Sequence, residues 1–460
     1  MDKSDNSMPM NGRRQTDYHC DTLVVGMGRT GLSCARYLHA RGIEFAIVDS
    51  RSAPPGLEEF ENMMADVPVT VGGFEPDLFQ AADCLVVSPG VSLDEPVVAQ
   101  ARRQGKVVLG DIEMFAGVVQ SPVVAITGSN GKSTVTVLVG QMAEQAGLEV
   151  RVGGNLGPPA LELIEANEPD LYVLELSSFQ LETTRSLDAA TSVVLNVSPD
   201  HMDRYGDLDE YAGAKQRVYR GTGIPVINKD DPATLQMVDS HRAPVMFTLG
   251  EPGDGEFGVR HHEGAQWLAF GDELLMPVSM LALKGRHNLA NVLAALSLGR
   301  NVGLEWAPML ETLQRFSGLP HRCQLVRTLD GVRWYNDSKA TNVGATVAAI
   351  NGMSDEGPLV LIAGGVGKSA DFSALSTAVS GTVRAVVLLG VDSDAIEAVI
   401  DEDQMCFRAA DMEHAIRLAR QQAEPGDCVL LSPACASFDM YDNYEQRGDH
   451  YAALVMELAS

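Results

Sequence analysis

Two Gly-Lys-Ser tripeptides are the residues in this sequence that point most directly to chemistry. The first lies in TGSNGKST, residues 127–134, and the second in GGVGKS, residues 364–369. In a phosphate-binding loop, backbone N–H groups and the lysine hold phosphate oxygens, and the hydroxyl residue that follows binds Mg²⁺. The question is whether both loops bind a nucleotide phosphate or whether one lysine holds a different anion.

The first loop has the order of elements that a phosphate site requires. An apolar strand pattern leads in, a glycine-rich turn follows, and a helical pattern leads out. We expect Lys132 to reach the β- and γ-phosphates of a nucleotide. Ile126 stands where the commonest NTPase pattern has glycine, which disfavours that class. The residues of the predicted phosphate loop are Gly128, Ser129, Asn130, Gly131, Lys132, Ser133 and Thr134, with Ser133 and Thr134 as Mg²⁺ ligands.

Two further polar residues follow neighbouring strand patterns. Glu175 ends the apolar stretch DLYVLE, and His201 comes shortly after SVVLNV. Because ligands of parallel sheets lie outside the carboxyl ends of the strands, both side chains should lie near the first loop. A carboxylate is a natural ligand for Mg²⁺. We therefore expect Glu175 and His201 to complete a metal site.

The stretch VVGMGRTG near the start of the chain is a different phosphate motif. Gly26, Gly28 and Gly31 match G-x-G-x-x-G between a strand and a helix pattern, and Asp49 ends the next strand. By itself this pattern favours an NAD-dependent oxidoreductase, but any pyrophosphate ligand fits the same geometry. Gly90 follows another predicted strand at what should be the same sheet edge.

The composition restricts the class of protein. The 460 residues exceed one ordinary core, and the formal net charge of −28 disfavours nucleic acid and anionic membranes as partners. Seven cysteines without C-x-x-C spacing predict reduced thiols in a cytoplasmic protein. No apolar run approaches the roughly 20 residues that span a bilayer, and residues 1–18 lack the apolar core of a signal peptide.

Strand and helix patterns alternate along the chain, which predicts an α/β fold in three domains. We place a disordered extension at residues 1–20, a Rossmann-like domain at 21–114, a central domain at 115–319 and a second Rossmann-like domain at 320–460. The central domain should be a P-loop mononucleotide-binding fold. Residues 245–285 hold short strands between glycine-rich turns, which predicts a small antiparallel patch.

Eight motifs in a fixed order carry a resemblance to a known family. They are TGSNGKST, LELSSFQLE, SPDHMDRYG, YAGAKQRVY, GRHNLANVLAA, GLPHRCQLV, NDSKATN and LLSPACASFDMYDNYEQRG. From about Asp21 to the C-terminus, the sequence resembles the Mur ligase family, cytoplasmic enzymes of bacterial peptidoglycan synthesis. The resemblance implies three α/β domains that bind, in order, a UDP-sugar substrate, ATP and an incoming amino acid.

The resemblance also implies a reaction and its cofactors. UDP-N-acetylmuramoyl-L-alanine and D-glutamate would be joined by an amide bond, through an acyl phosphate and a tetrahedral intermediate, with ATP and two Mg²⁺ ions. Lys215 would carry a carbamate and hold Mg²⁺, and Lys132, His201 and Lys215 would be catalytic. We expect a monomer whose C-terminal domain closes over the substrates.

The resemblance further assigns residues to each substrate. Besides the loop, the ATP contacts would be Asn288, Asn291, Arg322, Asp337 and Lys339. The UDP-substrate contacts would be Arg29, Thr30, Asp49, Arg51, Gly90, Asn155 and His201. The D-glutamate contacts would be Thr341, Lys368, Ser437 and Tyr444.

This assignment separates the two Gly-Lys-Ser loops. The resemblance implies that Lys368 of the second loop holds the carboxylate of D-glutamate, and no Glu-then-His pair that could serve a nucleotide follows this loop. Many relatives have aspartate where Val366 stands, which weakens the match of the loop but keeps the lysine. Three alternatives stay open: a Mur-type or folylpolyglutamate-type ligase that adds another amino acid, an NAD-dependent oxidoreductase, and a nucleotide-binding protein without catalysis.

Overall fold

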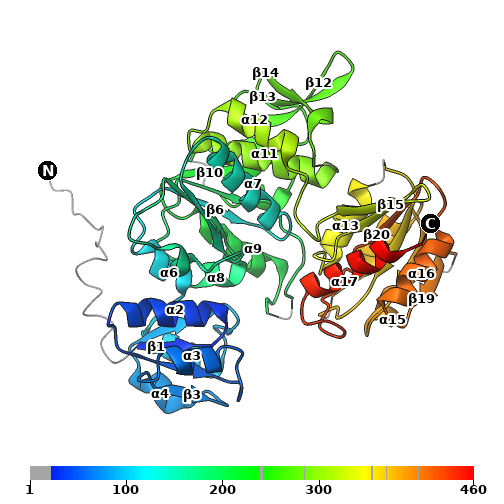
Figure 1. Cartoon of the computed structure of the whole chain (residues 1–460). Helices are drawn as coiled ribbons and strands as arrows, with labels where there is room; N and C mark the ends of the chain where they lie inside the picture. Colours follow the sequence, from blue (N-terminus) through cyan, green and yellow to red (C-terminus); the bar gives the residue numbers. More distant parts are fainter. Residues whose placement is uncertain are drawn as a thin grey trace.

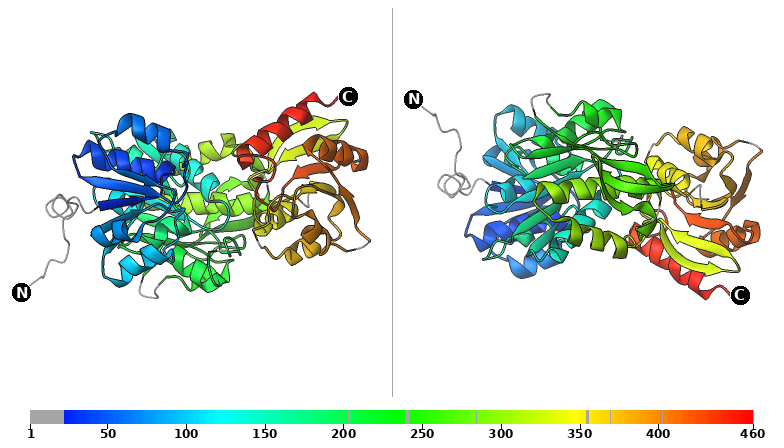
Figure 2. Two further views of the ribbon diagram at one scale, coloured as in Figure 1. Left: turned by 90° about the horizontal axis from the view of Figure 1, so that it is seen from below. Right: turned by 90° about the horizontal axis from the view of Figure 1, so that it is seen from above.

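The computed structural model describes residues 22–459 except 203, 239–241, 284, 354–355, 369 and 402. Three α/β domains follow one another along the chain, each built around its own sheet (Figures 1 and 2). This confirms the predicted fold class, whereas the residue at which each domain ends stays a prediction. The expected extension at residues 1–20 lies outside the described residues.

The N-terminal domain has a five-stranded parallel sheet in the order β3-β2-β1-β4-β5. Its strands are β1 (Thr22–Val25), β2 (Phe45–Asp49), β3 (Val69–Val71), β4 (Cys84–Val87) and β5 (Val107–Leu109). Its helices are α2 (Arg29–Ala40), α3 (Leu57–Met63), α4 (Pro76–Ala81), α5 (Pro96–Arg103) and α6 (Asp111–Ala116). Helices cover both faces, so Val24 and Val25 of β1 are both buried, in clusters on opposite sides of the sheet.

The central domain has a nine-stranded sheet in the order β14-β13-β12-β11-β10-β9-β6-β8-β7. The strands are β6 (Val123–Thr127), β7 (Val150–Gly154), β8 (Leu171–Glu175), β9 (Thr191–Val194), β10 (Ile224–Asn228), β11 (Val245–Phe247), β12 (Phe257–His262), β13 (Ala265–Phe270) and β14 (Glu273–Pro277). The α-helices are α7 (Lys132–Gln145), α8 (Ser178–Glu182), α9 (Leu208–Gln216), α10 (Pro232–Leu235), α11 (Arg286–Asn301) and α12 (Trp306–Arg315). The order places β6 between β8 and β9, so the turns after these three strands are neighbours.

The predicted antiparallel patch is present, but it is smaller than expected and continues the central sheet. β12, β13 and β14 pair antiparallel, whereas β11, at residues 245–247, pairs parallel with both β10 and β12. The chain between β10 and β11 contains α10 and is long enough for a crossover, which a parallel neighbour requires. Including β11 in the antiparallel patch was therefore wrong.

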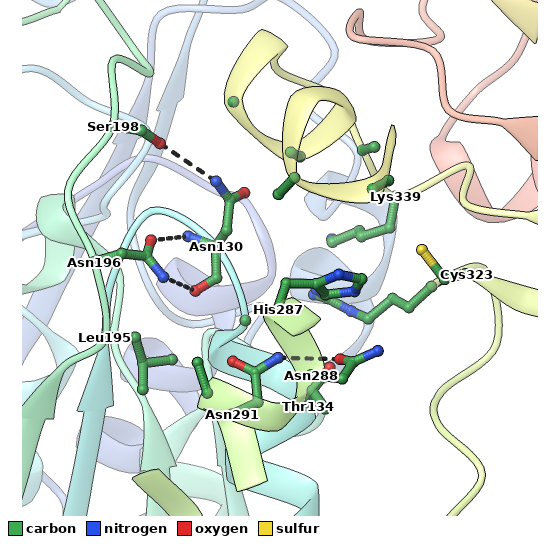
Figure 3. Close-up of a pocket in the computed structure, with 18 of the residues that line it drawn as sticks. Asn130, Thr134, Leu195, Asn196, Ser198, His287, Asn288, Asn291, Cys323 and Lys339 are labelled. Atoms are coloured by element: carbon green, nitrogen blue, oxygen red, sulfur yellow. Dashed lines mark hydrogen bonds between the residues drawn. The ribbon is translucent and has the colours of Figure 1, made fainter. Parts of the chain in front are cut away.

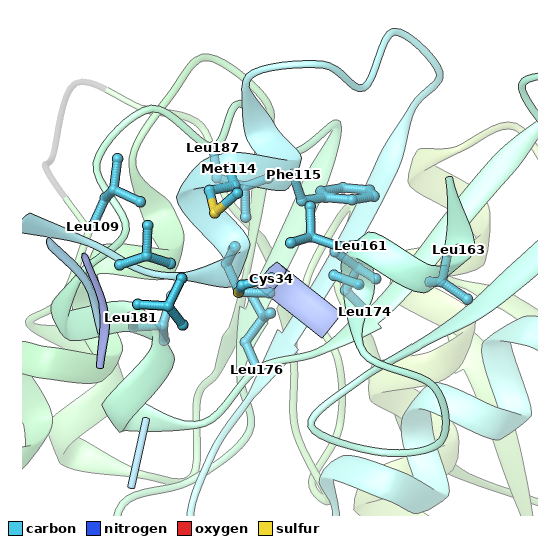
Figure 4. Close-up of a cluster of buried hydrophobic side chains, with 14 of the residues drawn as sticks. Cys34, Leu109, Met114, Phe115, Leu161, Leu163, Leu174, Leu176, Leu181 and Leu187 are labelled. Carbon is cyan, nitrogen blue, oxygen red and sulfur yellow. The ribbon is translucent and has the colours of Figure 1, made fainter. Parts of the chain in front are cut away.

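One cluster of buried side chains joins the first two domains (Figure 4). Cys34 and Leu109 of the N-terminal domain lie in the same cluster as Leu174 and Leu176 of the central domain. At its edge, the rings of Phe115 and Tyr172 meet at 5.1 Å in an edge-to-face arrangement. A shared apolar core fixes the position of the N-terminal sheet against the central sheet.

The C-terminal domain has a six-stranded sheet in the order β15-β16-β20-β17-β18-β19. The strands are β15 (Gln324–Leu329), β16 (Val332–Asn336), β17 (Leu359–Ala363), β18 (Val383–Leu388), β19 (Met405–Arg408) and β20 (Cys428–Leu431). The helices are α13 (Val343–Gly352), α14 (Ser373–Val379), α15 (Ser393–Glu397), α16 (Met412–Gln422) and α17 (Tyr444–Glu457). The three apolar strands expected from the sequence, β17, β18 and β20, are parallel and buried.

The C-terminal domain is attached differently from the N-terminal one. Among the described residues, its two buried clusters contain only side chains from position 323 onward, so the domain has a core of its own. Within the described part of the chain, polar side chains of Arg322 and Asn342 form hydrogen bonds to the central domain. Separately, no helix within the described part of the chain is both long and apolar enough to cross a bilayer.

Candidate functional site

The first Gly-Lys-Ser loop connects β6 to α7 as the sequence predicted. Gly128 and Gly131 have φ values of +151° and +84°, which favour glycine, and Lys132 is the first residue of the helix. A Cβ atom on Gly131 would lie 2.3 Å from Oδ1 of Asn291. The glycine therefore allows α11 to pack directly against the loop.

The segment after β9 holds the loop from outside. Asn130 donates its backbone N–H to Asn196 Oδ1 at 2.8 Å, and Asn196 returns a hydrogen bond from Nδ2 to the Asn130 carbonyl at 3.0 Å (Figure 3). Ser129 Oγ accepts a hydrogen bond from the backbone N–H of Ser198 at 2.9 Å. These hydrogen bonds hold the loop against the segment that follows β9.

Two lysine amino groups meet at one carbonyl oxygen of the loop. Nζ of Lys132 lies 2.8 Å and Nζ of Lys215 2.9 Å from the carbonyl oxygen of Gly128. Burial and the charge of Lys132 lower the pKa of Lys215 well below its ordinary value. Burial also lowers the pKa of Lys132, although Glu175 and Asp200 act in the opposite direction. Two adjacent lysine amino groups make this a position on the loop that suits an anion.

Glu175 ends β8 beside the two lysines, where the sequence placed it. Its Oε1 accepts a hydrogen bond from Asn155 Nδ2 at 2.6 Å, which brings this predicted UDP-substrate residue next to the phosphate loop. Its Oε2 is buried and has no hydrogen-bond partner among the described residues. A buried carboxylate oxygen without a donor fits a cation ligand.

The remaining predicted metal ligands form an incomplete set. Among the described residues, no group of three or more His, Cys, Asp or Glu side chains is arranged to hold a metal ion. Glu175 and His201 are the only predicted ligands of those types, so the oxygen atoms of Ser133, Thr134 and a modified Lys215 would have to complete a site. The donor set fits Mg²⁺ if phosphate oxygens join it.

His201 lies at a strained position in the segment after β9. Its φ is +57°, in the left-handed region that few non-glycine residues adopt. Asp200 accepts the backbone N–H of His201 through Oδ1 at 3.0 Å, and its Oδ2 lies 3.7 Å from the ring nitrogen Nε2. The imidazole meets the ring of Phe179 at 4.8 Å. Asp200 and Phe179 thus define the position of the imidazole.

A cavity of about 380 Å³ opens beside the loop, between the central and C-terminal domains (Figure 3). Asn288 and Asn291 of α11 line it, three residues apart, and Asn291 Nδ2 donates to Asn288 Oδ1 at 3.2 Å. His287 lines it as well, and burial lowers the pKa of this histidine to about 4. A neutral imidazole and two amides suit an uncharged planar ligand.

The C-terminal domain contributes three predicted residues to the same cavity. Arg322 donates from Nη2 to Ser133 Oγ at 2.8 Å. Burial raises the pKa of Asp337 to about 6, although its carboxylate accepts hydrogen bonds from Ser432 Oγ and the Cys323 backbone N–H. Burial and Arg322 lower the pKa of Lys339 to about 8. The structure therefore brings these residues together with the loop, as the sequence predicted.

The glycine motif of the N-terminal domain forms the expected turn at the sheet edge. Ser88, after β4, donates from Oγ to the Gly26 carbonyl at 3.0 Å, which brings the Gly90 loop beside it. A Cβ on Gly31 would lie 1.9 Å from that same carbonyl oxygen. Arg29 and Gly90 are exposed and Thr30 is half-buried, so all three are accessible to a ligand.

Asp49 already has protein partners at this edge. Its carboxylate accepts hydrogen bonds from the Met27 backbone N–H at 2.7 Å and from Arg51 Nη2 at 2.7 Å. Burial would raise its pKa, but these hydrogen bonds and the charge of Arg51 outweigh burial and lower the pKa to about 2. Asp49 thus supports the glycine turn and holds the guanidinium of Arg51 at the sheet edge.

The second Gly-Lys-Ser loop has a different shape from the first. Helix α14 begins only at Ser373, so Lys368 precedes it in an irregular segment with a φ of +52°, and Ser369 lies outside the described residues. The loop pairs with the segment before Ser437 through a bridge between Val366 and Ala436. The structure thus brings the Lys368 and Ser437 segments together.

The other two predicted amino-acid contacts lie near Lys339. The ammonium group of Lys339 lies 3.7 Å from the centre of the Tyr444 ring. The backbone N–H of Thr341 donates to the Lys339 carbonyl at 2.8 Å. Lys339 thus connects Thr341 and Tyr444 to the cavity.

The sequence analysis missed five residues of the site: Asn196, Ser198, Asp200, His287 and Asn342. Asp200 and Ser198 precede His201 after a predicted strand, so the same argument could have included them. His287 precedes Asn288 in one of the quoted motifs. Asn342 ends the quoted motif NDSKATN, but nothing in that motif indicates its contact, because its partners lie in another domain.

Fold and site together define a three-domain α/β protein with a phosphate-binding loop between domains. Three family models match it in order: the Mur ligase MurD-like N-terminal domain at residues 20–110, the Mur ligase middle domain at 126–299, and the Mur ligase glutamate ligase domain at 321–435. The chain belongs to the Mur ligase family.

Two similar proteins cover nearly the whole chain. A relative from Nitrosococcus oceani is 54% identical over 98% of this chain and 100% of its own length. One from Marinobacter nauticus is 52% identical over 94% of this chain and 97% of its own. Both are named UDP-N-acetylmuramoylalanine--D-glutamate ligase.

Solved structures share the fold at low sequence identity. A MurF ligase from Thermotoga maritima in complex with ADP is 17% identical, with a TM-score of 0.62 over 96% of each chain. A pseudomurein peptide ligase type C from Methanothermus fervidus is also 17% identical, with a TM-score of 0.60 over 95% of this chain and 100% of that one. The three-domain architecture is therefore the same.

We expect Gly131→Ala to destabilise the protein more than Gly147→Ala. Both glycines have left-handed φ values, +84° and +87°, so each alanine costs about 1–2 kcal/mol in the backbone. Only the Gly131 methyl group meets Asn291, which adds about 1–3 kcal/mol. Urea unfolding monitored by circular dichroism measures the difference. An equal decrease in the free energy of unfolding for the two variants would show that the Asn291 side chain moves away from the new methyl group without an energetic cost.

We also expect His287 to make the free energy of unfolding depend on pH. Its folded pKa of about 4 lies below the unfolded value of 6.5, so between these values the unfolded chain binds more protons. Stability is fully present above pH 6.5 and falls as the pH drops, by about 2 kcal/mol between pH 7 and pH 5. His287→Gln should remove this part of the slope, whereas exposed His261→Gln should not. An unchanged slope in His287→Gln would contradict the assignment.

Proposed function

We propose that this chain joins D-glutamate to UDP-N-acetylmuramoyl-L-alanine by an amide bond, with ATP as the source of energy. The observation that carries the proposal is the convergence of Lys132, Lys215 and Glu175 on one phosphate loop beside a cavity shared by two domains. The substrates are those in the name that both full-length relatives carry.

The chemistry explains why a cationic loop is needed. A carboxylate is a poor electrophile, and transfer of the γ-phosphoryl group of ATP makes it an acyl phosphate that an amine can attack. Negative charge moves through the transferring phosphoryl group, and Lys132 with the N–H groups of the loop stabilises it. Phosphate then leaves from the tetrahedral intermediate, and Arg322, bound to Ser133, sits where it can hold a phosphate oxygen.

Mg²⁺ would lie on the Glu175 side of the loop. Glu175, Ser133, Thr134, His201 and a carbamylated Lys215 would hold two ions, which neutralise phosphate charge when bound. The unpartnered Oε2 of Glu175 supports this position. His201, fixed by Asp200 and Phe179, also orients the muramoyl substrate.

The lowered pKa of Lys215 supports carbamylation of this residue. Lys215 is 1% exposed, and burial together with the charge of Lys132 favours the neutral form of its amine. A neutral amine can attack CO₂, forming an N–C bond and releasing one proton, whereas an ammonium cannot. The carbamate changes a cation that repels Lys132 into an anion that Lys132 attracts.

The other two substrates would bind at the two ends of the molecule. Uridine diphosphate would lie on the N-terminal turn, against Arg29, Thr30, Arg51 and Gly90, with Asp49 as the support of Arg51. Asn155 would reach the same substrate near Glu175. D-glutamate would bind Lys368, Thr341, Ser437 and Tyr444. We place the enzyme in the cytoplasm as a monomer, and the described cysteines, none of which forms a disulfide, accord with a reducing compartment.

Phosphate release from ATP tests the function. With UDP-N-acetylmuramoyl-L-alanine present, we expect release with D-glutamate and little with L-glutamate. Lys132→Ala should lower kcat by at least about 100-fold, because one buried donor to the transition state is lost. Lys229→Ala, which removes an exposed lysine paired with Glu256, is the matched control. Full activity in Lys132→Ala, or equal rates with both enantiomers, would reject the proposal.

Removal of CO₂ tests the carbamate. In degassed buffer at neutral pH, we expect activity to fall and to return on addition of bicarbonate. With ¹³C-bicarbonate, the wild-type protein should give a carbamate carbon signal that Lys215→Arg lacks. The Lys229→Ala variant should keep both the signal and the response. Activity that is indifferent to CO₂, together with no Lys215-dependent signal, would show that the amine stays unmodified.

A further inference from the structure

One side chain of the C-terminal domain, Asn342, reaches across to the phosphate site of the central domain. Its Nδ2 donates a hydrogen bond to Asp200 Oδ2 at 3.0 Å and lies 3.5 Å from Asn130 Oδ1. The first contact is a good hydrogen bond and the second is at the limit of one. Asn130 belongs to the phosphate loop, and Asp200 holds the backbone of His201.

The same side chain begins helix α13. Asn342 is the N-cap residue, and its Oδ1 accepts the backbone N–H of Ala345 at 2.8 Å. The side-chain oxygen of Asn342 therefore caps its own helix, while the side-chain nitrogen binds the central domain. Because one amide makes both contacts, the start of α13 cannot move away from Asp200 without losing a hydrogen bond.

Helix α13 forms a wall of the cavity and touches the central domain at both ends. Near its start, a Cβ on Gly344 would lie 2.9 Å from Ser198 Oγ, and at its end a Cβ on Gly352 would lie 2.4 Å from His287 Nδ1. Glycine at both positions allows close approach. The position of the helix therefore depends on the segments that surround a bound nucleotide.

The helix start is also adjacent to the proposed amino-acid site. Thr341 directly precedes Asn342, and its backbone N–H is bound to the carbonyl of Lys339, whose ammonium lies on the ring of Tyr444. Thr341 and Tyr444 are both proposed D-glutamate contacts. A shift of Asn342 therefore moves one side of that site.

Asp200 connects a bound nucleotide to the hydrogen bond between Asn342 and Asp200, because its charge acts on the lysines at the phosphate loop. Its charge acts on both Lys132 and Lys215, for which it is one of two nearby counter-charges. Bound phosphates would take over that role, since they carry more charge and lie on the same lysines. Asp200 would then be held by His201 on one oxygen and by Asn342 on the other.

We propose that Asn342 is a positioning residue that couples nucleotide binding to D-glutamate binding, through its hydrogen bond to Asp200 and its cap on α13. This inference rests on the proposed function. Such coupling is reciprocal, so each ligand tightens the other by the same factor, typically about 5- to 150-fold.

The test separates the bridge from the cap. Asn342→Ser keeps a good N-cap but is too short to reach Asp200, and Asn342→Asp keeps the cap but replaces the donor with a carboxylate. Asp411→Ser is the matched control, because Asp411 caps α16 through the His414 N–H at an exposed position. The dissociation constant of D-glutamate is measured by calorimetry on the full chain, with and without a non-hydrolysable ATP analogue and Mg²⁺.

In the wild-type protein, we expect the nucleotide to tighten D-glutamate binding at least about fivefold. Both Asn342 variants should reduce that factor to near one, and they should weaken glutamate binding more in the presence of nucleotide than in its absence. Asp411→Ser should keep the wild-type factor.

Three outcomes would overturn the inference: a wild-type factor near one, a factor retained in both Asn342 variants, or an equal loss of glutamate affinity with and without nucleotide. Phosphate release by the wild-type protein is measured alongside. If the wild-type protein releases no phosphate, the proposed function is wrong. If it releases phosphate but both Asn342 variants keep the wild-type tightening of D-glutamate binding by the nucleotide, only the role of Asn342 is wrong.

Discussion

The contact on which the site depends is the meeting of two lysine amino groups at the carbonyl oxygen of Gly128. Lys132 and Lys215 lie within hydrogen-bond distance of the same atom, so their charges repel each other at short range. Glu175 and Asp200 offset that repulsion in part. What remains favours an anion at the loop and lowers the pKa of Lys215.

The N-terminal and C-terminal domains are attached to the central domain, which holds the loop, in different ways. The loop follows β6, which lies inside a nine-stranded sheet, and α11 packs against it through Asn291 because Gly131 has no side chain. The N-terminal domain shares a buried core with the central domain and is held in place. The C-terminal domain has its own core, and its Arg322 and Asn342 form hydrogen bonds to Ser133 and Asp200 of the central domain.

The two Gly-Lys-Ser loops show how backbone geometry separates similar sequences. Lys132 begins a helix, so the N–H groups around it point toward one anion and add the favourable end of the helix dipole. Lys368 lies several residues before α14, in a segment paired with the Ser437 loop. Lys368 therefore lacks the N–H groups of a helix start beside it, which the first loop has.

The sequence by itself determined the α/β alternation, the phosphate loop and the predicted positions of Glu175, His201 and Lys368, because strand, turn and helix patterns are local. Only the tertiary structure decided that β11 pairs parallel, that Asp49 is engaged by Arg51 and Met27, and that Asp200 and Asn342 meet across two domains. Contacts such as Asp49 with Met27 or Asp200 with Asn342 join residues far apart in sequence, so they exist only after the chain has folded and, for Asn342, after two domains have docked.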